Sequence, residues 1–440
     1  MADPQATVQA LLDELVARDE ERGLQVAVYF QGEQVVDAWS GVADPATGRT
    51  VDGDTLFPVF STTKGIVATV IHLLAERGIV EYDAPVARYW PEFAANGKAG
   101  ITVRHALAHT AGVPQLPDGV TAADLCDWDA TCRGIAALEP LWEPGTATGY
   151  HALSYGWILG EVARRADGRP FDQIVREEIC APLGIVDLFV GIPDAVEDRV
   201  APMEVDPHAA PAPPLPPDAL ANRAIPLTVQ PLADFINRPD TRRAVIPGGG
   251  GIMTARAIAR HYAALTGDER DGTQLLPPAR LRLATALQTE ATDLVAGTAM
   301  RKALGYMLGM TGSPRSTRAS AFGHGGAGGS EGFSDPEHRL AFGLTKNRMV
   351  VSPPGESTAN RVASAVRTAL GIPSNPPTPR RRHWSHDATA PTGIDLSTTS
   401  AKALLIDEGG AVVASAATPS AFRRRDRSGP SRTRATGGRA

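Results

Sequence analysis

The sequence Phe60-Ser61-Thr62-Thr63-Lys64-Gly65 opens the stretch that decides the fold, and it runs on through apolar residues to Gly78. Apolar side chains recur at helical spacing from Ile66 to Leu74, and a glycine such as Gly78 is typical of a helix end. The pattern therefore predicts a helix whose first turn carries Ser61. Lys64 follows three residues later, so its side chain is expected on the same helix face as the serine hydroxyl.

A serine beside a lysine at the start of a helix has a chemical use. A serine hydroxyl is a weak nucleophile until a neighbouring base takes its proton, and an amine in a dry site with a lowered pKa can serve as that base. The free N–H groups at a helix start also stabilise the negative charge of an acyl-transfer intermediate. The spacing Ser-x-x-Lys also occurs by chance, and its position at the head of an apolar helix is what strengthens it.

The composition and net charge indicate a globular protein that does not bind a strongly charged macromolecule or membrane. The chain has 440 residues, 43% hydrophobic residues and a net charge of −6, although residues 422–440 hold seven Arg and one Asp. This balance gives no reason to expect nucleic acid or an anionic membrane as partner. The chain shows neither a secretory signal nor an apolar run long enough to span a bilayer, so a cytoplasmic protein is expected. Three cysteines fit reduced, structural thiols: Cys126, Cys132 and Cys180.

The order of the predicted elements indicates a mixed α/β fold. Residues 24–30 and 34–40 alternate as a hairpin, and residues 55–60 form a strand that leads into Ser61. The chain is then mainly helical and loop-rich to about residue 300. Residues 322–333 and 340–345 are predicted as a returning antiparallel strand pair, and a helix over 361–370 closes the domain. We therefore expect an antiparallel sheet flanked by helices, with a mostly helical insertion.

Three other segments carry residue types that occur in binding sites. His105 and His109 lie four residues apart, but without an intervening glutamate or a third ligand the pair favours packing or hydrogen bonding over zinc. The Gly248–Gly251 run lacks the residues of a phosphate or dinucleotide loop, and it predicts a close backbone approach instead. No cofactor and no metal are predicted. The Pro-rich stretch 202–217 is a surface loop or a lid, and the sequence leaves both open.

Three segments in order resemble the serine β-lactamase and penicillin-binding-protein superfamily, and most of all its class-C-like esterase branch. They are Ser61-x-x-Lys64, Pro144-Gly-x-x-x-Gly-Tyr150-His151-Ala152 and His324-Gly325-Gly326. The resemblance covers roughly residues 5–372. It includes the flanking segments 107–112, 248–256 and 332–349.

The resemblance implies a role for each motif. Ser61 would be the acylated nucleophile and Lys64 its partner, and Tyr150 would assist proton transfer to the leaving group and from the hydrolytic water. The backbone N–H groups of Ser61 and Ala327 would form the oxyanion hole, with Ala327 on the edge strand. Because tyrosine has an ordinary pKa near 10, Tyr150 is expected to act as a base only if a positive charge such as Lys64 lowers its pKa.

Two departures from the family pattern bear on the substrate. Ala152 stands where β-lactamases have Asn, and His324 stands where β-lactamases and peptidases have Lys. Since a lysine keeps a fixed charge that helps to hold a substrate carboxylate and a histidine is mostly neutral at pH 7, both changes favour uncharged esters. His324, Gly325 and Gly326 would then line the substrate site of a carboxylesterase for small esters. A β-lactamase or D-amino-acid peptidase, and a silent protein that binds a ligand in the same cleft, are the alternatives.

The C-terminal part is expected to be separate from the catalytic domain. The serine hydrolase domain is predicted over residues 1–372, with its sheet from about 20–60 and 305–372 and its helical part over about 65–300. Residues 373–440 would hold a Pro/Arg-rich linker, a fragment, and a disordered basic tail. The fragment, Gly393 through Val413, resembles the opening hairpin of sugar kinases such as xylulokinase, but the rest of such a kinase is missing. The sequence does not reveal the oligomeric state.

Overall fold

The computed structural model describes residues 2–207, 215–216, 218–267, 273–310, 320–349 and 356–372, and the backbone of 392–396, 400–406 and 412–419. The chain divides into two compact units, Met1–Thr378 and Pro379–Ala440. The second unit contains a three-stranded antiparallel sheet of β13 (Thr392–Leu396), β14 (Ser400–Ile406) and β15 (Val412–Pro419). The predicted linker and the predicted disordered basic tail, residues 423–440, lie outside the described residues.

The first unit is built on a seven-stranded sheet of order β3-β2-β1-β11-β10-β9-β8. All neighbouring strands in it are antiparallel. The hairpin expected over residues 24–40 is confirmed as the β1–β2 pair, and β1 then pairs with β11 from the far end of the chain. The strands are β1 (Gly23–Phe30), β2 (Glu33–Asp44), β3 (Arg49–Thr50), β8 (Met307–Leu308), β9 (Phe322–Gly325), β10 (Glu331–Asp335) and β11 (Leu340–Lys346).

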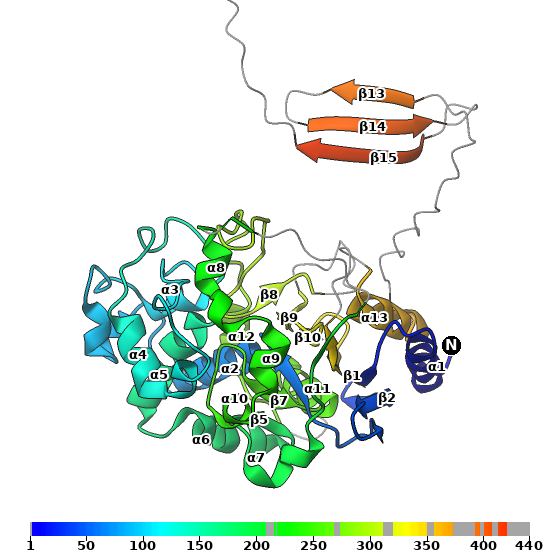
Figure 1. Cartoon of the computed structure of the whole chain (residues 1–440), viewed down its shortest axis with the longest axis horizontal. Helices are drawn as coiled ribbons and strands as arrows, with labels where there is room; N and C mark the ends of the chain where they lie inside the picture. Colours follow the sequence, from blue (N-terminus) through cyan, green and yellow to red (C-terminus); the bar gives the residue numbers. More distant parts are fainter. Residues whose placement is uncertain are drawn as a thin grey trace, which may run out of the picture. The chain divides into compact units, whose positions relative to one another are not determined.

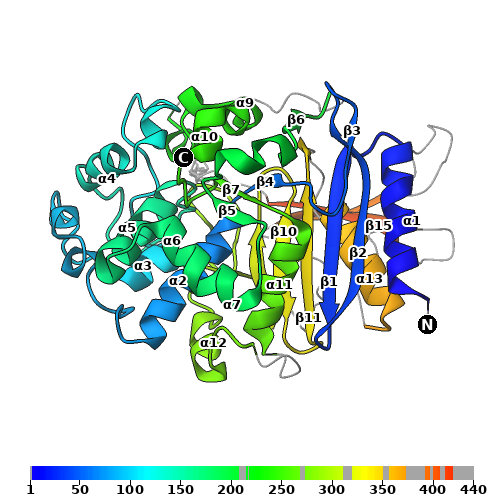
Figure 2. The same cartoon turned by 90° about the horizontal axis from the view of Figure 1, so that it is seen from below.

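Terminal helices cover one face of this sheet. Helix α1 (Pro4–Ala17) buries Val8, Leu12 and Leu15, which are spaced to lie on one side of a helix. They form a single apolar cluster with strand residues and with α13 (Thr358–Ala369). Figure 2 shows α1 and α13 together on this side, with α11 (Ala255–Thr266) on the other side of the sheet.

Helix α2 (Thr63–Glu76) is the centre of the helical part. All thirteen residues from Thr63 to Ala75 are buried, so α2 is a core helix rather than an amphipathic surface helix. Helices on the side of the molecule away from α1 surround it (Figure 1). The remaining helices are α3 (Val103–Leu107), α4 (Trp128–Ala136), α5 (Ser154–Asp167), α6 (Phe171–Val175), α7 (Ala181–Leu183), α8 (Leu220–Ala224), α9 (Leu232–Asn237), α10 (Pro239–Arg243) and α12 (Pro278–Ala284).

The strand that leads into Ser61 does not belong to the main sheet, contrary to expectation. β4 (Phe57–Phe60) pairs with β7 (Gly251–Met253), which pairs with β5 (Leu188–Val190) in a separate three-stranded sheet. The main sheet could not accept β4 beside the hairpin, because β2 and β11 already occupy the two hydrogen-bonding edges of β1. Another short pair joins β6 (Glu204–Val205) to β12 (Arg348–Met349).

The segment 322–333 forms two strands instead of the single strand expected. A turn over residues 326–330 separates β9 from β10, and hydrogen bonds from Gly326 N to Ser330 O (2.8 Å) and from Gly329 N to Gly326 O (2.9 Å) close it. Gly329 has φ +92°, which a glycine adopts without strain. Ala327 therefore lies exposed in a turn. β8 pairs only with Phe322 and Gly323 of β9, so among the described strands the His324–Gly325 part of β9 has a neighbour, β10, on one side only.

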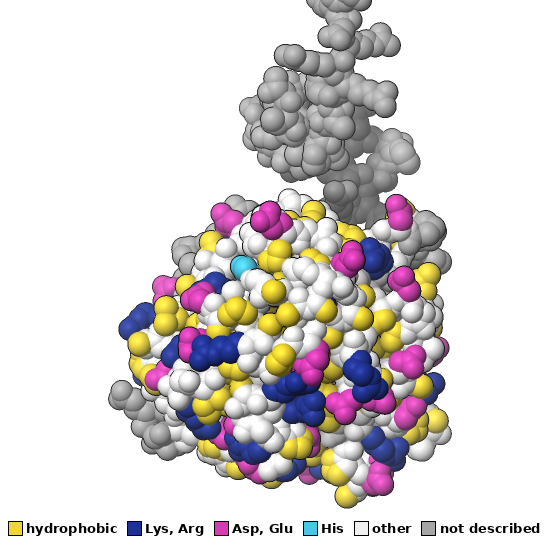
Figure 3. Space-filling model, turned by 90° about the vertical axis from the view of Figure 1, so that its left-hand side faces the viewer, with side chains coloured by type: hydrophobic (Ala, Val, Ile, Leu, Met, Phe, Trp, Pro, Cys, Tyr) yellow, Lys and Arg dark blue, Asp and Glu magenta, His cyan; other side chains and the backbone are white. Residues whose placement is uncertain are grey.

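The surface of the first unit carries mixed charge. On the face drawn in Figure 3, basic and acidic side chains are interspersed, with single apolar side chains between them. Among the described residues, no helix combines the length and the apolar character that a membrane crossing needs.

Candidate active site

A strained elbow presents Ser61. Phe60, the last residue of β4, has φ +46°, a left-handed conformation that is rare for a non-glycine residue and often marks a functional site. Thr63 Oγ1 donates to Phe60 O (2.5 Å) and accepts from Gly251 N (3.0 Å), so the turn is tied to β7. Because α2 begins at Thr63, Ser61 lies in the turn before the helix and not in its first turn.

Lys64 is completely buried and contacts three acceptors. Its Nζ lies 2.9 Å from Ser61 Oγ, 2.6 Å from Ala152 O and 2.5 Å from Gly248 O. Burial lowers the pKa of Lys64 well below its ordinary value. The two carbonyls can only accept, so an uncharged amine would donate its two hydrogens to them and direct its lone pair at the Ser61 hydroxyl. The geometry thus suits a base aimed at Ser61.

Tyr150 lies beside this pair, at the end of the loop before α5. Its ring centroid is 5.0 Å from Lys64 Nζ, and its side chain is hydrogen-bonded to Ser61. Burial raises the pKa of Tyr150 above its ordinary value, while the Ser61 hydrogen bond opposes this rise and the charge of Asp293 adds to it. Burial thus favours the protonated phenol, and the lowered pKa that base action by Tyr150 alone would require is not found.

Asp293 and Lys302, which the sequence patterns did not reveal, hold the backbone of Tyr150 in place. Asp293 Oδ1 accepts from the backbone N–H of Tyr150 (3.0 Å), and its other oxygen is paired with Lys302 Nζ. Both side chains of this ion pair are fully buried. Asp293 is 143 residues away from Tyr150 in the chain. No local pattern could have revealed it.

His324, the first residue of the third motif, is buried on β9. Its Nδ1 lies 2.8 Å from Gly325 O, which fixes the tautomer with the proton on Nδ1. Nε2 has no hydrogen-bond partner among the described residues. Burial, and next repulsion from Lys64 when that side chain is protonated, lower the pKa of His324 to about 3, so the imidazole is neutral. The His324 and Tyr150 ring centroids lie 6.1 Å apart, which brings the third motif to the second.

The turn after the third motif is tied to the elbow. Ser330 Oγ donates to Val59 O (2.8 Å), and Thr62 Oγ1 donates to Ser330 O (3.3 Å). A Cβ on Gly326 would lie 2.1 Å from Val59 O, so only glycine permits this contact. Within the described part of the chain, the backbone N–H groups of Ser61 and Ala327 donate to no acceptor. The hydrogen bonds of Ser330 thus hold together the two segments whose backbone N–H groups are predicted to form the oxyanion hole.

The two histidines of the 101–109 segment each accept a backbone hydrogen bond, His105 from its own segment and His109 from a distant one. His105 Nδ1 accepts from Thr102 N (3.3 Å) at the start of α3, and His109 Nδ1 accepts from His151 N (3.1 Å). The His109 ring also stacks on Tyr155, with ring centroids 4.8 Å apart. The described residues contain no cluster of His, Cys, Asp and Glu that could hold a metal ion.

The Gly248–Gly251 loop packs against α5 as closely as predicted. A Cβ on Gly156 of α5 would lie 2.0 Å from Gly248 N, and a Cβ on Gly248 would lie 2.5 Å from Leu153 O. This close approach is confirmed, and it brings the Gly248 carbonyl to Lys64. The three cysteines are free thiols, as expected, and burial raises the pKa of each of them.

A serine, a lysine and a tyrosine gathered at the head of a buried helix are the equipment of a serine hydrolase. The beta-lactamase family model matches residues 8–367. The esterase/beta-lactamase LipL of Mycobacterium tuberculosis is 37% identical over 347 residues, which are 74% of this chain and 77% of that protein. The crystal structure of a family VIII carboxylesterase is 36% identical, with a TM-score of 0.75 over 84% of this chain and 98% of its own. A penicillin-binding-protein homologue from Caulobacter crescentus is 37% identical, with the same TM-score and the same coverage of both chains.

The chain belongs to the beta-lactamase family. The family model ends at residue 367, and the comparisons give no support to the sugar-kinase resemblance of residues 393–413.

Proposed function

We propose that this protein is a carboxylesterase of the class-C-like branch that cleaves small esters through an acyl-enzyme on Ser61. The observation that carries the proposal is the contact between Lys64 Nζ and Ser61 Oγ, 2.9 Å long, while two carbonyls accept the two hydrogens of the uncharged amine. The names of the relatives agree, since LipL is called an esterase and the structural relative a carboxylesterase.

In the acylation step, Lys64 Nζ accepts the proton of the Ser61 hydroxyl while Oγ attacks the ester carbonyl carbon. The resulting oxyanion receives hydrogen bonds from the N–H groups of Ser61 and Ala327, which have no other acceptor in the described part of the chain. Because these donors belong to a turn and an elbow that Ser330 ties together, little reorganisation is needed as charge develops.

Collapse of the tetrahedral intermediate breaks the bond to the alcohol oxygen. Tyr150, which burial keeps protonated, donates its phenolic proton to the departing alkoxide. The Lys64 ammonium formed in the previous step, whose Nζ lies 5.0 Å from the centre of the Tyr150 ring, then returns a proton to the phenolate. Both groups regain their starting protonation, and the acyl group stays on Ser61.

Water completes the cycle in the reverse direction. Tyr150 and Lys64 together take a proton from the attacking water, and the ester bond to Ser61 Oγ breaks as Oγ regains its proton. The acid product and the free enzyme result, with no change in oxidation state. No cofactor enters this scheme.

The third motif favours an uncharged substrate. His324 is neutral, with a pKa of about 3, and so it supplies no fixed charge for a substrate carboxylate. Ala152 is buried and has no side-chain amide to offer. We therefore assign His324, Gly325 and Gly326 to the wall of a site for small, uncharged esters, and we rank β-lactams and D-amino-acid peptides below these esters.

The test compares three chromogenic substrates on the wild type and on Ser61→Ala. p-Nitrophenyl acetate and p-nitrophenyl butyrate probe esterase activity, and a chromogenic cephalosporin probes β-lactamase activity. We expect ester turnover that the variant lacks, with little cephalosporin cleavage. Cephalosporin cleavage as fast as ester cleavage would contradict the substrate assignment. No turnover of any substrate would favour a silent binding protein.

A further inference from the structure

We propose that the buried ion pair of Asp293 and Lys302 is a positioning element that fixes Tyr150 for proton transfer. The proposal rests on the proposed function, because it assumes that Tyr150 transfers protons. Neither residue lies in any of the three motifs. Asp293 acts on the backbone of Tyr150, so the role of the pair is to hold the tyrosine and not to react with the substrate.

One carboxylate oxygen of Asp293 accepts hydrogen bonds both from its own turn and from the backbone of Tyr150. Oδ1 accepts from Tyr150 N (3.0 Å), Val295 N (2.9 Å) and Ala296 N (2.8 Å). The hydrogen bonds and the charge of Lys302 overcome the burial of Asp293 and lower the pKa of its carboxyl, so it remains an anion. An anion that accepts three backbone N–H groups locks the turn around residues 293–296 and the main chain of Tyr150 into one unit.

Lys302 extends this unit to the residues before the tyrosine. Its Nζ is paired with Asp293 Oδ2 and donates to Thr148 Oγ1 (2.6 Å). Leu294 N also donates to Thr148 O (2.9 Å). Backbone hydrogen bonds between Thr289 and Lys302 and between Asp293 and Thr298 tie the 289–302 segment together as a closed loop. The chain is thereby held at residues 148 and 150 by the same loop.

Other hydrogen bonds hold the residues on either side of Tyr150, and Asp293 holds Tyr150 itself. His109 accepts from Gly149 N at its backbone oxygen (3.1 Å) and from His151 N at Nδ1 (3.1 Å). These bonds fix the residues on either side of the tyrosine. The Tyr150 N–H is the remaining donor of the segment, and Asp293 is its acceptor.

A buried ion pair is weak evidence for stability, because the cost of removing two charges from water can exceed their attraction. Its value here is geometric. Tyr150 must keep its hydroxyl at Ser61, and a misplacement of about 1 Å in an active site can cost about 100-fold in rate. The hydrogen bonds of a charge pair have fixed directions, so they restrict the displacement of Tyr150 better than apolar packing does.

The test is a double-mutant cycle in the full-length chain, with p-nitrophenyl butyrate as substrate. Asp293→Ala should lower kcat about 100-fold and leave KM within about twofold. In the Tyr150→Phe background, the same change should lower kcat by less than about threefold, because the group that it positions is already gone. Asp293→Asn keeps an oxygen for the backbone N–H groups and should recover about tenfold of the loss, which also covers the case in which Asp293→Ala fails to fold.

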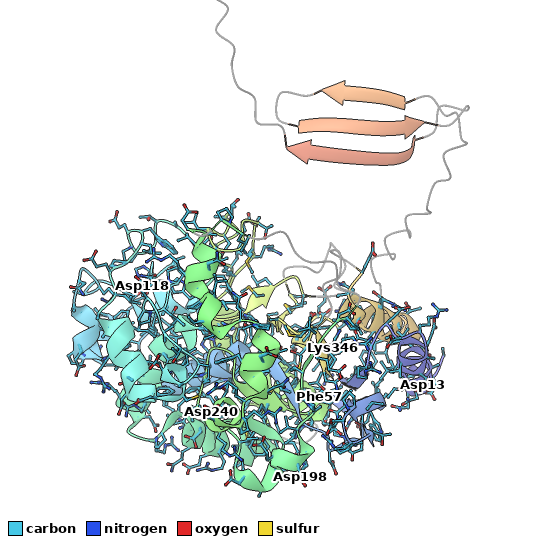
Figure 4. The ribbon with its side chains drawn as sticks, in the orientation of Figure 1. Asp13, Phe57, Asp118, Asp198, Asp240 and Lys346 are labelled. Carbon is cyan, nitrogen blue, oxygen red and sulfur yellow. The ribbon has the colours of Figure 1, made fainter. Side chains whose placement is uncertain are left out.

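Glu21 and Lys346 provide a matched control. They form another buried ion pair, in which Glu21 also accepts from Thr358 Oγ1. Lys346 lies at the end of β11 and is labelled in Figure 4. Glu21→Ala should lower the melting temperature and leave kcat within about twofold.

Two results would overturn the inference. If Tyr150→Phe alone keeps full activity, both the proposed role of the tyrosine and the positioning element are wrong. If Tyr150→Phe is costly but Asp293→Ala costs the same factor in both backgrounds, or if Glu21→Ala lowers kcat equally, the proposed function stands. The loss at Asp293 is then a general effect of a buried charge, and the positioning inference is refuted.

Discussion

Replacing Lys64 by methionine removes the proposed base while keeping most of the volume of the side chain. The change deletes the contact to Ser61 Oγ and leaves Ala152 O and Gly248 O without their donor. A positioned general base contributes about 10²–10⁴-fold to a rate. We therefore expect kcat for p-nitrophenyl butyrate to fall about 1000-fold, which corresponds to about 4 kcal/mol of activation free energy.

The same substitution also affects folding. Each buried carbonyl left without a donor costs about 1–3 kcal/mol, so the free energy of unfolding should fall by about 2–6 kcal/mol. Urea unfolding measures this loss. The kinetic assay is then run at a temperature where the variant remains folded.

Lys98 supplies the control for the folding effect. It is also completely buried, and its Nζ donates to Ala95 O (2.6 Å), Ala136 O (2.9 Å) and Leu138 O. None of these acceptors belongs to the candidate site. Lys98→Met should therefore lower the free energy of unfolding by a similar amount and leave kcat within about twofold. A Lys64→Met variant that keeps more than a tenth of wild-type kcat, or equal losses of kcat in the two variants, would refute the assignment of Lys64 as the base.

Two further predictions concern packing and pH. Gly156→Ala places a Cβ 2.0 Å from Gly248 N, so it should displace the loop that binds Lys64 and lower kcat at least about tenfold. Gly100→Ala is the control: its Cβ would have no atom within 4 Å, and it should change neither kcat nor the melting temperature. Burial lowers the pKa of four histidines from the ordinary value of 6.5 to about 3 or 4. The unfolded chain therefore takes up protons that the folded chain does not, and stability that is complete above pH 6.5 is lost as the pH falls toward 4. Each such histidine should cost about 1 kcal/mol per pH unit in that window, and equal free energies of urea unfolding at pH 7.5 and pH 5.5 would contradict this. The four are His72, His261 and His324, with a pKa of about 3, and His151, with a pKa of about 4.

The local part of the site was predictable from the sequence because it depends on helical spacing. Ser61 and Lys64 are three residues apart, and such residues face each other wherever a helix begins nearby. The glycines of the 248–251 loop likewise predicted a close backbone approach, which the packing of this loop on α5 confirms. The mixed α/β fold with an antiparallel sheet followed from the alternation in the first hairpin and in the returning strands.

The remaining features depend on contacts between distant segments. The partner of β4 is a three-residue strand that follows a glycine run, and no periodicity marks so short a strand. The Asp293–Lys302 pair reaches Tyr150 across more than 140 residues. The direction in which the pKa of Tyr150 shifts could not be predicted, because the sequence shows the neighbouring lysine but not the burial that shifts the pKa of both side chains.

The most direct test of the proposed mechanism is whether Ser61 carries an acyl group during turnover. The wild type and Ser61→Ala are each mixed with p-nitrophenyl butyrate, quenched in acid within the first turnovers and analysed by mass spectrometry of their peptides. We expect a butyryl group, about 70 Da, on the peptide that contains Ser61 in the wild type, and no adduct in the variant. An adduct on a different residue, or ester turnover retained by Ser61→Ala, would contradict it.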